Sequence, residues 1–385
     1  MSSALTFDPV RLPEPCETLR AEVRAFLADE IARGTFDPRT PHHDESSARE
    51  FARRVATRGW IGLTWPKAYG GQERSFLERY VLSEEFYAVN APVQYYFVAD
   101  RQCGPMLLRY ADESVRSALV PKIARGELSI CIGMSEPDSG SDLFAAKARA
   151  ERTANGWRLN GTKVWTTGAH FADYMVGYFR TSAPTAKDRR HGLTSFLVDM
   201  KSPGITVNRI RQMTGFADFA EVVFQDVDVP LLHAIGEIDG AWKQATVELS
   251  YERSGPERFL EPFHLLPQVL HQMRECPRDT EAESVGRLAA QLHAMRRMSV
   301  SVAGMLEAGK QPVVEAAIVK DLGTVWEQQL PGKLRTIAEC VNASDALSDF
   351  LERLAYAQTV APKYTIAGGT TEILRGIIAR GLGVR

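Results

Sequence analysis

Cysteine and net charge are both scarce in this 385-residue chain. There are five cysteines and no Cys-x-x-Cys pair, so the sequence predicts the reduced thiols of a cytoplasmic protein and no disulfide framework. The formal net charge is -2, and basic residues do not cluster with aromatic ones, which argues against a nucleic-acid partner. The cysteines are Cys16, Cys103, Cys131, Cys276 and Cys340.

Long apolar runs and several well-known catalytic motifs are also missing. No apolar run is long enough to span a membrane, and residues 1–30 lack a signal-peptide core, so we expect no membrane insertion. The eight histidines have no metal-ligand spacing, and there is no Gly-x-Ser-x-Gly elbow or Walker loop. What remains is an ordinary globular composition, 44% hydrophobic and 24% charged, on a chain long enough for two or three compact units.

The spacing of hydrophobic residues changes twice along the chain. It is helical from Glu17 to about Glu127, becomes short and strand-like near Ser129, and turns helical again from about Gly240. This order predicts an α+β protein with an all-helical domain at 1–128, a small β-barrel or sandwich domain at 129–236, and a helical bundle at 237–385. It is not the alternating pattern of a Rossmann fold.

Two local patterns stand out around the start of the β domain. The pairs Asn155-Gly156 and Asn160-Gly161 are typical of tight turns between short strands. Before them, "CIGMSEPDSGSDL" at 131–143 combines free backbone N–H groups with the hydroxyls of Ser135, Ser139 and Ser141. Such a loop suits an electron-rich heterocycle or a phosphate, and the alternative is a polar surface loop.

Four segments resemble the acyl-CoA dehydrogenase family, and they occur in that family's order. They are "MSEPDSGSD" at 134–142, "NGTKVWTTGAHFADYMV" at 160–176, "FAEVVFQDVDVP" at 219–230 and "GGTTEILRGIIAR" at 368–380. The resemblance begins with "GWIGLTWPKAYGG" at 59–71 and covers nearly the whole chain. It implies the acyl-CoA dehydrogenase fold, with a C-terminal four-helix bundle, and an FAD shared between the subunits of an oligomer.

The resemblance assigns four residues to the flavin ring. The backbone of Met134 and the hydroxyl of Ser135 are expected to face its pyrimidine end. Trp165 is expected to pack against the ring, and Thr167 to form a hydrogen bond near N5. Such contacts tune the reduction of a flavin and exclude water. The alternative for Trp165 is an ordinary aromatic residue in the core of a strand.

The resemblance also assigns residues away from the ring. Ser141 corresponds to a position near the thioester or the pyrophosphate of the CoA substrate. Thr370 and Glu372 match positions that contact the adenosine end of FAD, often from a second subunit.

The base that removes the α-proton of the acyl-CoA is the least obvious part of the site. Many family members have a catalytic glutamate where this chain has Gly368, which has no carboxylate. The isovaleryl- and long-chain-type branches carry a Glu-Arg pair on the first long helix of the bundle instead, and Glu252-Arg253 stands at the matching place. We therefore predict Glu252 as the base and place Arg253 with the substrate. The alternative for Glu252 is a solvated helix glutamate.

Three departures from the family pattern affect neighbouring features. The Arg-x-x-Phe-Gly segment that reaches the FAD of the next subunit is absent, and Arg274 or Arg278 could replace its arginine. The Gly-Gly-x-Gly loop before the C-terminal segment is also absent. Pro256 follows the predicted base closely and is expected to kink or end its helix.

These observations predict an enzyme that oxidises an acyl-CoA to a trans-2-enoyl-CoA with FAD and passes the electrons to an electron-transferring flavoprotein. Branches with the helix-borne base often accept branched, bulky or long acyl chains. Two alternatives stay open: a flavin-dependent monooxygenase on the same fold, and one subunit of a heteromeric acyl-CoA dehydrogenase that is inactive alone.

Overall fold

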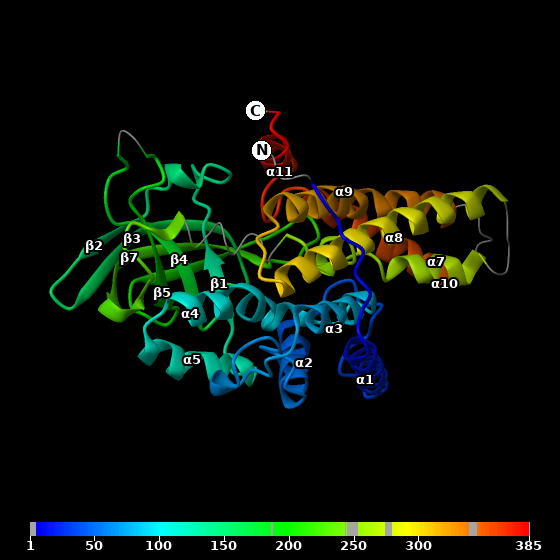
Figure 1. The fold of residues 1–385 in the computed structure, drawn as a ribbon, viewed down its shortest axis with the longest axis horizontal. Helices are drawn as coiled ribbons and strands as arrows, with labels where there is room; N and C mark the ends of the chain where they lie inside the picture. The colour runs from blue at the N-terminus through cyan, green and yellow to red at the C-terminus, as the bar shows by residue number, and fades with distance from the viewer. Residues whose placement is uncertain are drawn as a thin grey trace. The chain divides into compact units, whose positions relative to one another are not determined.

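The structure, a computed structural model, describes residues 5–185, 188–242, 244, 253–273, 279–338 and 345–384 (Figure 1). Its contacts divide the chain into two compact units. The helical unit comprises Met1–His43, Arg74–Pro92 and Ser250–Arg385, and the sheet unit comprises Asp44–Glu73 and Val93–Leu249. The domain boundaries expected from the sequence, 1–128, 129–236 and 237–385, remain a prediction.

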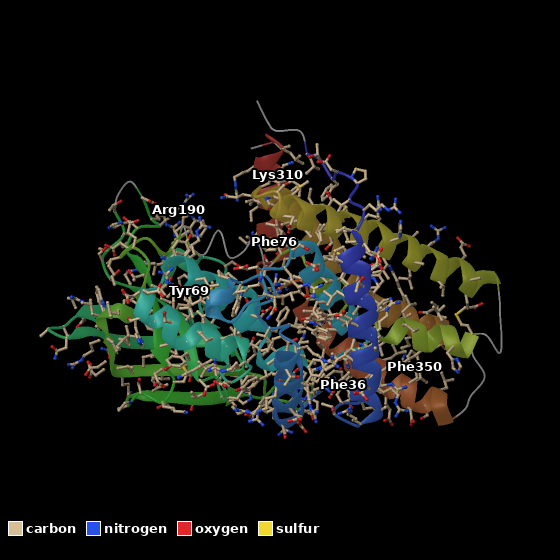
Figure 2. The ribbon with its side chains drawn as sticks, turned by 60° about the horizontal axis from the view of Figure 1, so that its bottom comes forward. Phe36, Tyr69, Phe76, Arg190, Lys310 and Phe350 are labelled. Atoms are coloured by element: carbon tan, nitrogen blue, oxygen red, sulfur yellow. The ribbon has the colours of Figure 1, made fainter. Side chains whose placement is uncertain are left out.

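The helical unit is built around four helices that share one apolar core. They are α7 (Leu265–Met273), α8 (Asp279–Glu307), α9 (Val313–Ala338) and α10 (Asp345–Val360), and α8 and α9 run side by side (Figure 1). The core includes Phe259, Trp326, Leu330 and Phe350, and Figure 2 places Phe350 within the bundle. The four-helix bundle is therefore confirmed. Burial of these side chains provides its main stabilisation, since each fully buried large apolar side chain contributes about 1.5–3 kcal/mol.

Two earlier helices and a C-terminal helix complete this unit. α1 (Glu14–Ala32) packs on α3 (Phe76–Ala88), which packs on α8. Glu84 of α3 joins them, because it accepts hydrogen bonds from Arg20 of α1 at 2.9 Å and from Arg296 of α8 at 2.6 Å. The short turns η6 (Pro256–Arg258) and η7 (Ala361–Lys363) and the last helix, α11 (Thr371–Gly381), contact α9.

The sheet unit combines short helices with one eight-stranded sheet. Its helices are α2 (Glu45–Thr57), α4 (Gly104–Tyr110) and α5 (Glu113–Ala124). The strands are β1 (Ile130–Gly133), β2 (Arg149–Arg152), β3 (Gly156–Thr167), β4 (Tyr174–Arg180), β5 (Leu193–Asp199), β6 (Ile205–Ile210), β7 (Phe219–Pro230) and β8 (Ala234–Ile235). They pair in the order β6-β7-β3-β2-β4-β5-β8, and β1 lies parallel to β4. The α+β class and its β middle region are confirmed.

The two Asn-Gly pairs have different structures. Asn155-Gly156 lies in the turn from β2 to β3, where the Thr153 N–H donates to the Gly156 carbonyl at 3.0 Å. The expected turn at Asn160-Gly161 is wrong, because this pair lies inside β3 at a bulge, with Gly161 at φ +134°. The Asn160 amide holds the bulge to the neighbouring strand by donating to Asp226 Oδ1 at 3.1 Å and accepting from the Asp226 N–H at 3.0 Å.

Candidate active site

A buried carboxylate anchors the loop that follows β1. Glu136 Oε1 accepts from Lys163 Nζ at 2.8 Å and from the Ala148 N–H at 3.0 Å, and Oε2 accepts from the Lys147 N–H at 2.6 Å. Burial lowers the pKa of the Lys163 ammonium, and the Glu136 carboxylate opposes this shift because it favours the charged form. The loop is therefore fastened to β3 from inside the protein, which fixes the residues on either side of Glu136.

The same anchoring places Ser135 beside Trp165. The Val164 N–H donates to the Ser135 carbonyl at 2.9 Å, so Ser135 is bonded to the residue that precedes Trp165 in β3. Met134 immediately follows β1, and both Met134 and Ser135 are half-buried. Three of the residues assigned to the flavin ring thus lie close together on two joined segments.

Trp165 leaves the regular alternation of its strand. It has a φ of +58°, unusual for a residue with a Cβ, and lies where the β3–β7 register shifts between Lys163 and Thr166. Lys163 and Thr166 are buried, whereas Trp165 is 59% exposed and meets Phe219 edge-on with ring centroids 6.2 Å apart. The alternative of a strand core aromatic is therefore excluded. The backbone displays a large flat ring outside the core.

The three serines of the loop are not equivalent. Ser139 is buried and its hydroxyl donates to the Asp142 carbonyl at 2.8 Å, so this donor is used within the loop and is not offered to a ligand. Ser141 is exposed, next to Asp142, whose carboxylate pairs with Arg189 at 2.7 Å. Thr167, at the end of β3, is exposed and pairs with Phe219 of β7.

In the helical unit, two consecutive glycines form the turn before α11. Gly368 has a φ of +70° and Gly369 a φ of +106°, which glycine adopts without steric cost. Lys320 of α9, whose side chain is completely buried, donates to the Gly369 carbonyl at 2.9 Å. Arg253, also buried, lies against the same residue: a Cβ built on Gly369 would be 3.3 Å from Arg253 Nη2. The turn therefore lies next to both cations.

Thr370 and Glu372 lie at the start of α11. The Thr370 hydroxyl caps the helix by accepting from the Ile373 N–H at 3.4 Å. Glu372 is exposed in the first turn. The pKa of its carboxyl group is lowered mainly by a hydrogen bond from its own backbone N–H and, to a smaller extent, by a hydrogen bond with the Thr370 side chain. The glycine turn, the Thr370 cap and the ionised Glu372 carboxylate therefore lie next to one another at the start of α11.

Several residues considered in the sequence lie outside the described part of the chain. Glu252, Arg274 and Arg278 are among them, so their assignments remain predictions. Beyond Glu252, Gly255 is extended and Pro256–Arg258 forms a single 3-10 turn, so no helix continues through Pro256. Among the described residues, no group of three or more His, Cys, Asp or Glu side chains could hold a metal ion, and no helix is long and apolar enough to cross a membrane.

Sequence reasoning missed two residues that shape the site. Glu136 belongs to the "MSEPDSGSD" motif, but its role as a buried anchor was not predicted because its partner Lys163 lies in a separate segment. Lys320 directly follows the apolar run "AAIV" of α9, which was a signal for a buried cation with a specific partner.

The chain is similar to known proteins in both sequence and fold. Residues 13–127 match the family "Acyl-CoA dehydrogenase, N-terminal domain" and residues 131–227 match "Acyl-CoA dehydrogenase, middle domain". The acyl-CoA dehydrogenase IpdE1 of Mycobacterium tuberculosis is 30% identical over 378 residues, which cover 94% of this chain and 96% of that protein.

Two solved structures have the same fold over almost their whole length. One, "Tcur3481-Tcur3483 steroid ACAD", has a TM-score of 0.84 and 27% identity, covering 98% of this chain and 99% of that one. The other is the ChsE4-ChsE5 complex from Mycobacterium tuberculosis, with a TM-score of 0.82 and 25% identity over 98% of this chain and 99% of that one. The chain described here belongs to the acyl-CoA dehydrogenase family, a family of oxidoreductases.

Proposed function

We propose that this chain catalyses the α,β-dehydrogenation of an acyl-CoA thioester to a trans-2-enoyl-CoA, with Glu252 as the base. The observation that carries the proposal is the contact between Arg253 and Gly369. Gly368 stands where many relatives have their catalytic glutamate, and Arg253 is the residue directly after Glu252. A base supplied at Glu252 would thus come from a chain segment already packed against the turn that lacks one.

The chemistry requires a carboxylate at this place. The α-carbon of a thioester is a weak acid, so its proton must be within hydrogen-bond reach of a base in a pocket that contains little water. Arg253 is buried beside the turn, and a buried cation favours negative charge next to it. We place Arg253 with the substrate for the same reason: a buried guanidinium stabilises negative charge that develops on the thioester.

The described residues fit FAD, the cofactor of this proposal. The exposed, outward-turned indole of Trp165 offers a flat surface for an aromatic ring system, and the backbone of Met134 and the hydroxyl of Ser135, on the anchored loop, would form hydrogen bonds at its edge. Thr167 is exposed two residues beyond Trp165, within the same strand. FAD supplies a hydride acceptor, and these residues orient it and keep water away.

Other parts of the proposal rest on residue positions alone. Thr370 and Glu372 would bind the adenosine end of FAD, since an ionised carboxylate at a helix start can accept hydrogen bonds from ribose hydroxyls. Ser141, exposed on the loop, would contact the CoA moiety. An electron-transferring flavoprotein as acceptor and a cytoplasmic location complete the proposal.

A second candidate function is a subunit of a mixed oligomer. The structural relative titled as the ChsE4-ChsE5 complex contains two different chains, and the present chain lacks the Arg-x-x-Phe-Gly segment. Expressing the chain alone distinguishes the candidates. A yellow, active homo-oligomer supports the self-sufficient enzyme, and a colourless protein that becomes yellow only with a related subunit supports the mixed oligomer.

The reaction is tested by anaerobic bleaching of the bound flavin. The panel should contain straight-chain, branched and steroid-side-chain acyl-CoA thioesters, because one similar structure is titled a steroid ACAD and the Glu252 position favours bulky acyl groups. We expect at least one bulky thioester to bleach the flavin and to be recovered as its enoyl product. If no thioester bleaches it, but reduced flavin and oxygen hydroxylate a substrate, the monooxygenase alternative replaces this proposal.

A further inference from the structure

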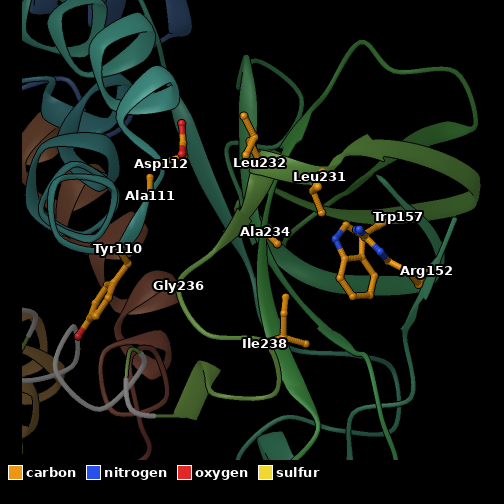
Figure 3. Close-up of a pocket in the computed structure, with 10 residues that line it drawn as sticks. All are labelled: Tyr110, Ala111, Asp112, Arg152, Trp157, Leu231, Leu232, Ala234, Gly236 and Ile238. Atoms are coloured by element: carbon orange, nitrogen blue, oxygen red, sulfur yellow. The ribbon is translucent and has the colours of Figure 1, made fainter. Parts of the chain in front are cut away.

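A hollow of about 580 Å³ in the sheet unit contains none of the residues assigned to FAD or the thioester (Figure 3). Its walls come from the β2–β3 hairpin, from η5 (Leu231–His233) with β8, and from the connection between α4 and α5. All of these segments belong to one compact unit. The volume falls within the range of small-molecule sites.

The hollow contains a buried hydrogen-bond donor with no acceptor. Trp157 is only 7% exposed, and its indole N–H is buried without a hydrogen-bond partner among the described residues. Its ring packs edge-on against Phe196 with centroids 5.4 Å apart, so the indole is held in the sheet core. In Figure 3 the nitrogen lies on the side of the ring that faces the hollow. A buried donor normally has an acceptor, and because Trp157 lines the hollow, its indole N–H is placed where a ligand could supply one.

A cation stands beside this donor. The Arg152 guanidinium lies over the Trp157 ring, 5.1 Å from its centroid, and donates weakly to the Gly156 carbonyl at 3.4 Å. No carboxylate in the described ranges forms an ion pair with it. Asp112, across the hollow, caps α5 by accepting from the Ser114 N–H at 2.9 Å and from its hydroxyl at 2.5 Å. Arg152 is therefore available for an anion.

Apart from Tyr110 and Asp112, the rest of the wall is aliphatic or glycine. Leu231, Leu232 and Ile238 are 47%, 50% and 41% exposed, which leaves a concentrated apolar surface next to Trp157 and Arg152. A ligand that satisfied all of these groups would carry an anionic acceptor at one end and an apolar body at the other.

We propose that this hollow is a binding site for an aliphatic carboxylic acid. The carboxylate accepts from the Trp157 indole N–H and pairs with Arg152, and the hydrocarbon covers Leu231, Leu232 and Ile238. Hydrogen bonds to an ionised acceptor are stronger than neutral ones, so the carboxylate distinguishes this ligand from an alcohol of the same length. The site is separate from the proposed reaction, and its test does not depend on activity.

The test is fluorine NMR of the purified full-length protein labelled with 5-fluorotryptophan and titrated with decanoate below its micelle concentration. The chain has six tryptophans, and the signal lost in Trp157→Phe identifies Trp157. We expect that signal to shift and saturate with decanoate and to stay in place with 1-decanol. By calorimetry, Trp157→Phe and Arg152→Gln should each weaken this binding about tenfold or more.

Two matched variants serve as controls. Trp326→Phe removes another buried indole N–H without a partner, in the core of the bundle, and Arg149→Gln removes an arginine of the same strand as Arg152. Both should bind decanoate like the parent protein. The proposal is overturned if the Trp157 signal ignores decanoate, if decanol moves it equally, or if the controls weaken binding as much as the test variants. It is also overturned if the signal moves only with protein concentration, since a second copy of the chain would then cover the hollow.

Discussion

At the scale of single residues, Trp165 combines an unfavourable backbone with an exposed side chain. A φ of +58° at a non-glycine residue costs on the order of 1–3 kcal/mol of stability. Because Trp165 is 59% exposed, burial of its indole offsets little of this cost. The buried neighbours Lys163 and Thr166 and the bulge in β3 hold the conformation in place. Strain of this kind is typical of positions where a ligand contacts the ring.

Trp165→Ala should release FAD more readily and leave the fold intact. The exposed indole contributes little to the core, so the melting temperature without FAD should change little, while the stabilisation by added FAD should fall. Trp326→Ala is the control, because truncating a buried tryptophan costs about 3–5 kcal/mol with or without FAD. Thermal melts of all three proteins at several FAD concentrations test this. Equal FAD stabilisation of Trp165→Ala and the parent would contradict the assignment.

At the scale of elements, α9 holds the turn that leads into α11. Lys320 reaches from α9 to the Gly369 carbonyl, and the next residue, Thr370, caps α11. The position of Glu372 and the contact between Arg253 and Gly369 therefore both depend on this turn. One hydrogen bond from a buried ammonium of α9 thus holds the turn that Arg253 lies against and that leads into the segment assigned to the cofactor.

Lys320→Met keeps the length of the side chain and removes its donor. The Gly369 carbonyl would lose its partner, so we expect a loss of about 1–3 kcal/mol in unfolding free energy and weaker retention of FAD. Lys310→Met, at an exposed lysine, should change neither quantity. Chemical unfolding and the FAD dissociation constant are the measurements. A Lys320→Met protein that is as stable as the parent and binds FAD equally well would show that the turn does not need this bond.

The strands also show which parts of the fold could be predicted from the sequence. The runs that became β4, β5 and β7 are rich in β-branched and aromatic residues, and each formed a strand because local propensity and burial agree. Asn160-Gly161 was misread because its bulge depends on Asp226, a partner far along the chain. The Glu136–Lys163 pair and the hydrogen bond from Lys320 to Gly369 were not predicted for the same reason, because the two partners are far apart in the sequence. The family resemblance assigned Trp165 to the flavin ring, but its exposure and positive φ are visible only in the structure.

At the scale of the whole molecule, the central expectation is that FAD joins subunits. The family resemblance assigns Trp165 and Thr370 to opposite ends of one cofactor, and the positions like Thr370 often act from a second subunit. A ligand that bridges subunits stabilises the assembly by mass action. Removal of FAD should therefore lower the melting temperature and shift the oligomer toward smaller species.

This dependence is measured by analytical ultracentrifugation of the holo and apo proteins over a range of concentrations. We expect the apo protein to dissociate at concentrations at which the holo protein stays assembled, and added FAD to restore the assembly. FAD binding to isolated monomers, together with identical apo and holo melting temperatures, would refute a shared cofactor site.

The identity of the base is tested most directly by stopped-flow flavin reduction in Glu252→Gln. Glutamine keeps the size of the side chain and removes its basicity, so the variant should fold, stay yellow and bind acyl-CoA, but reduce its flavin about 10²–10⁴-fold more slowly. Gly368→Glu, added to it, should restore only part of the rate, because a glutamate is strained at a φ of +70° and a misplacement of about 1 Å can cost about 10²-fold. Glu257→Gln, at another acid of the segment, should reduce its flavin like the parent. Flavin reduction by Glu252→Gln at the parent rate would contradict the account, because the α-proton would then be removed by another residue.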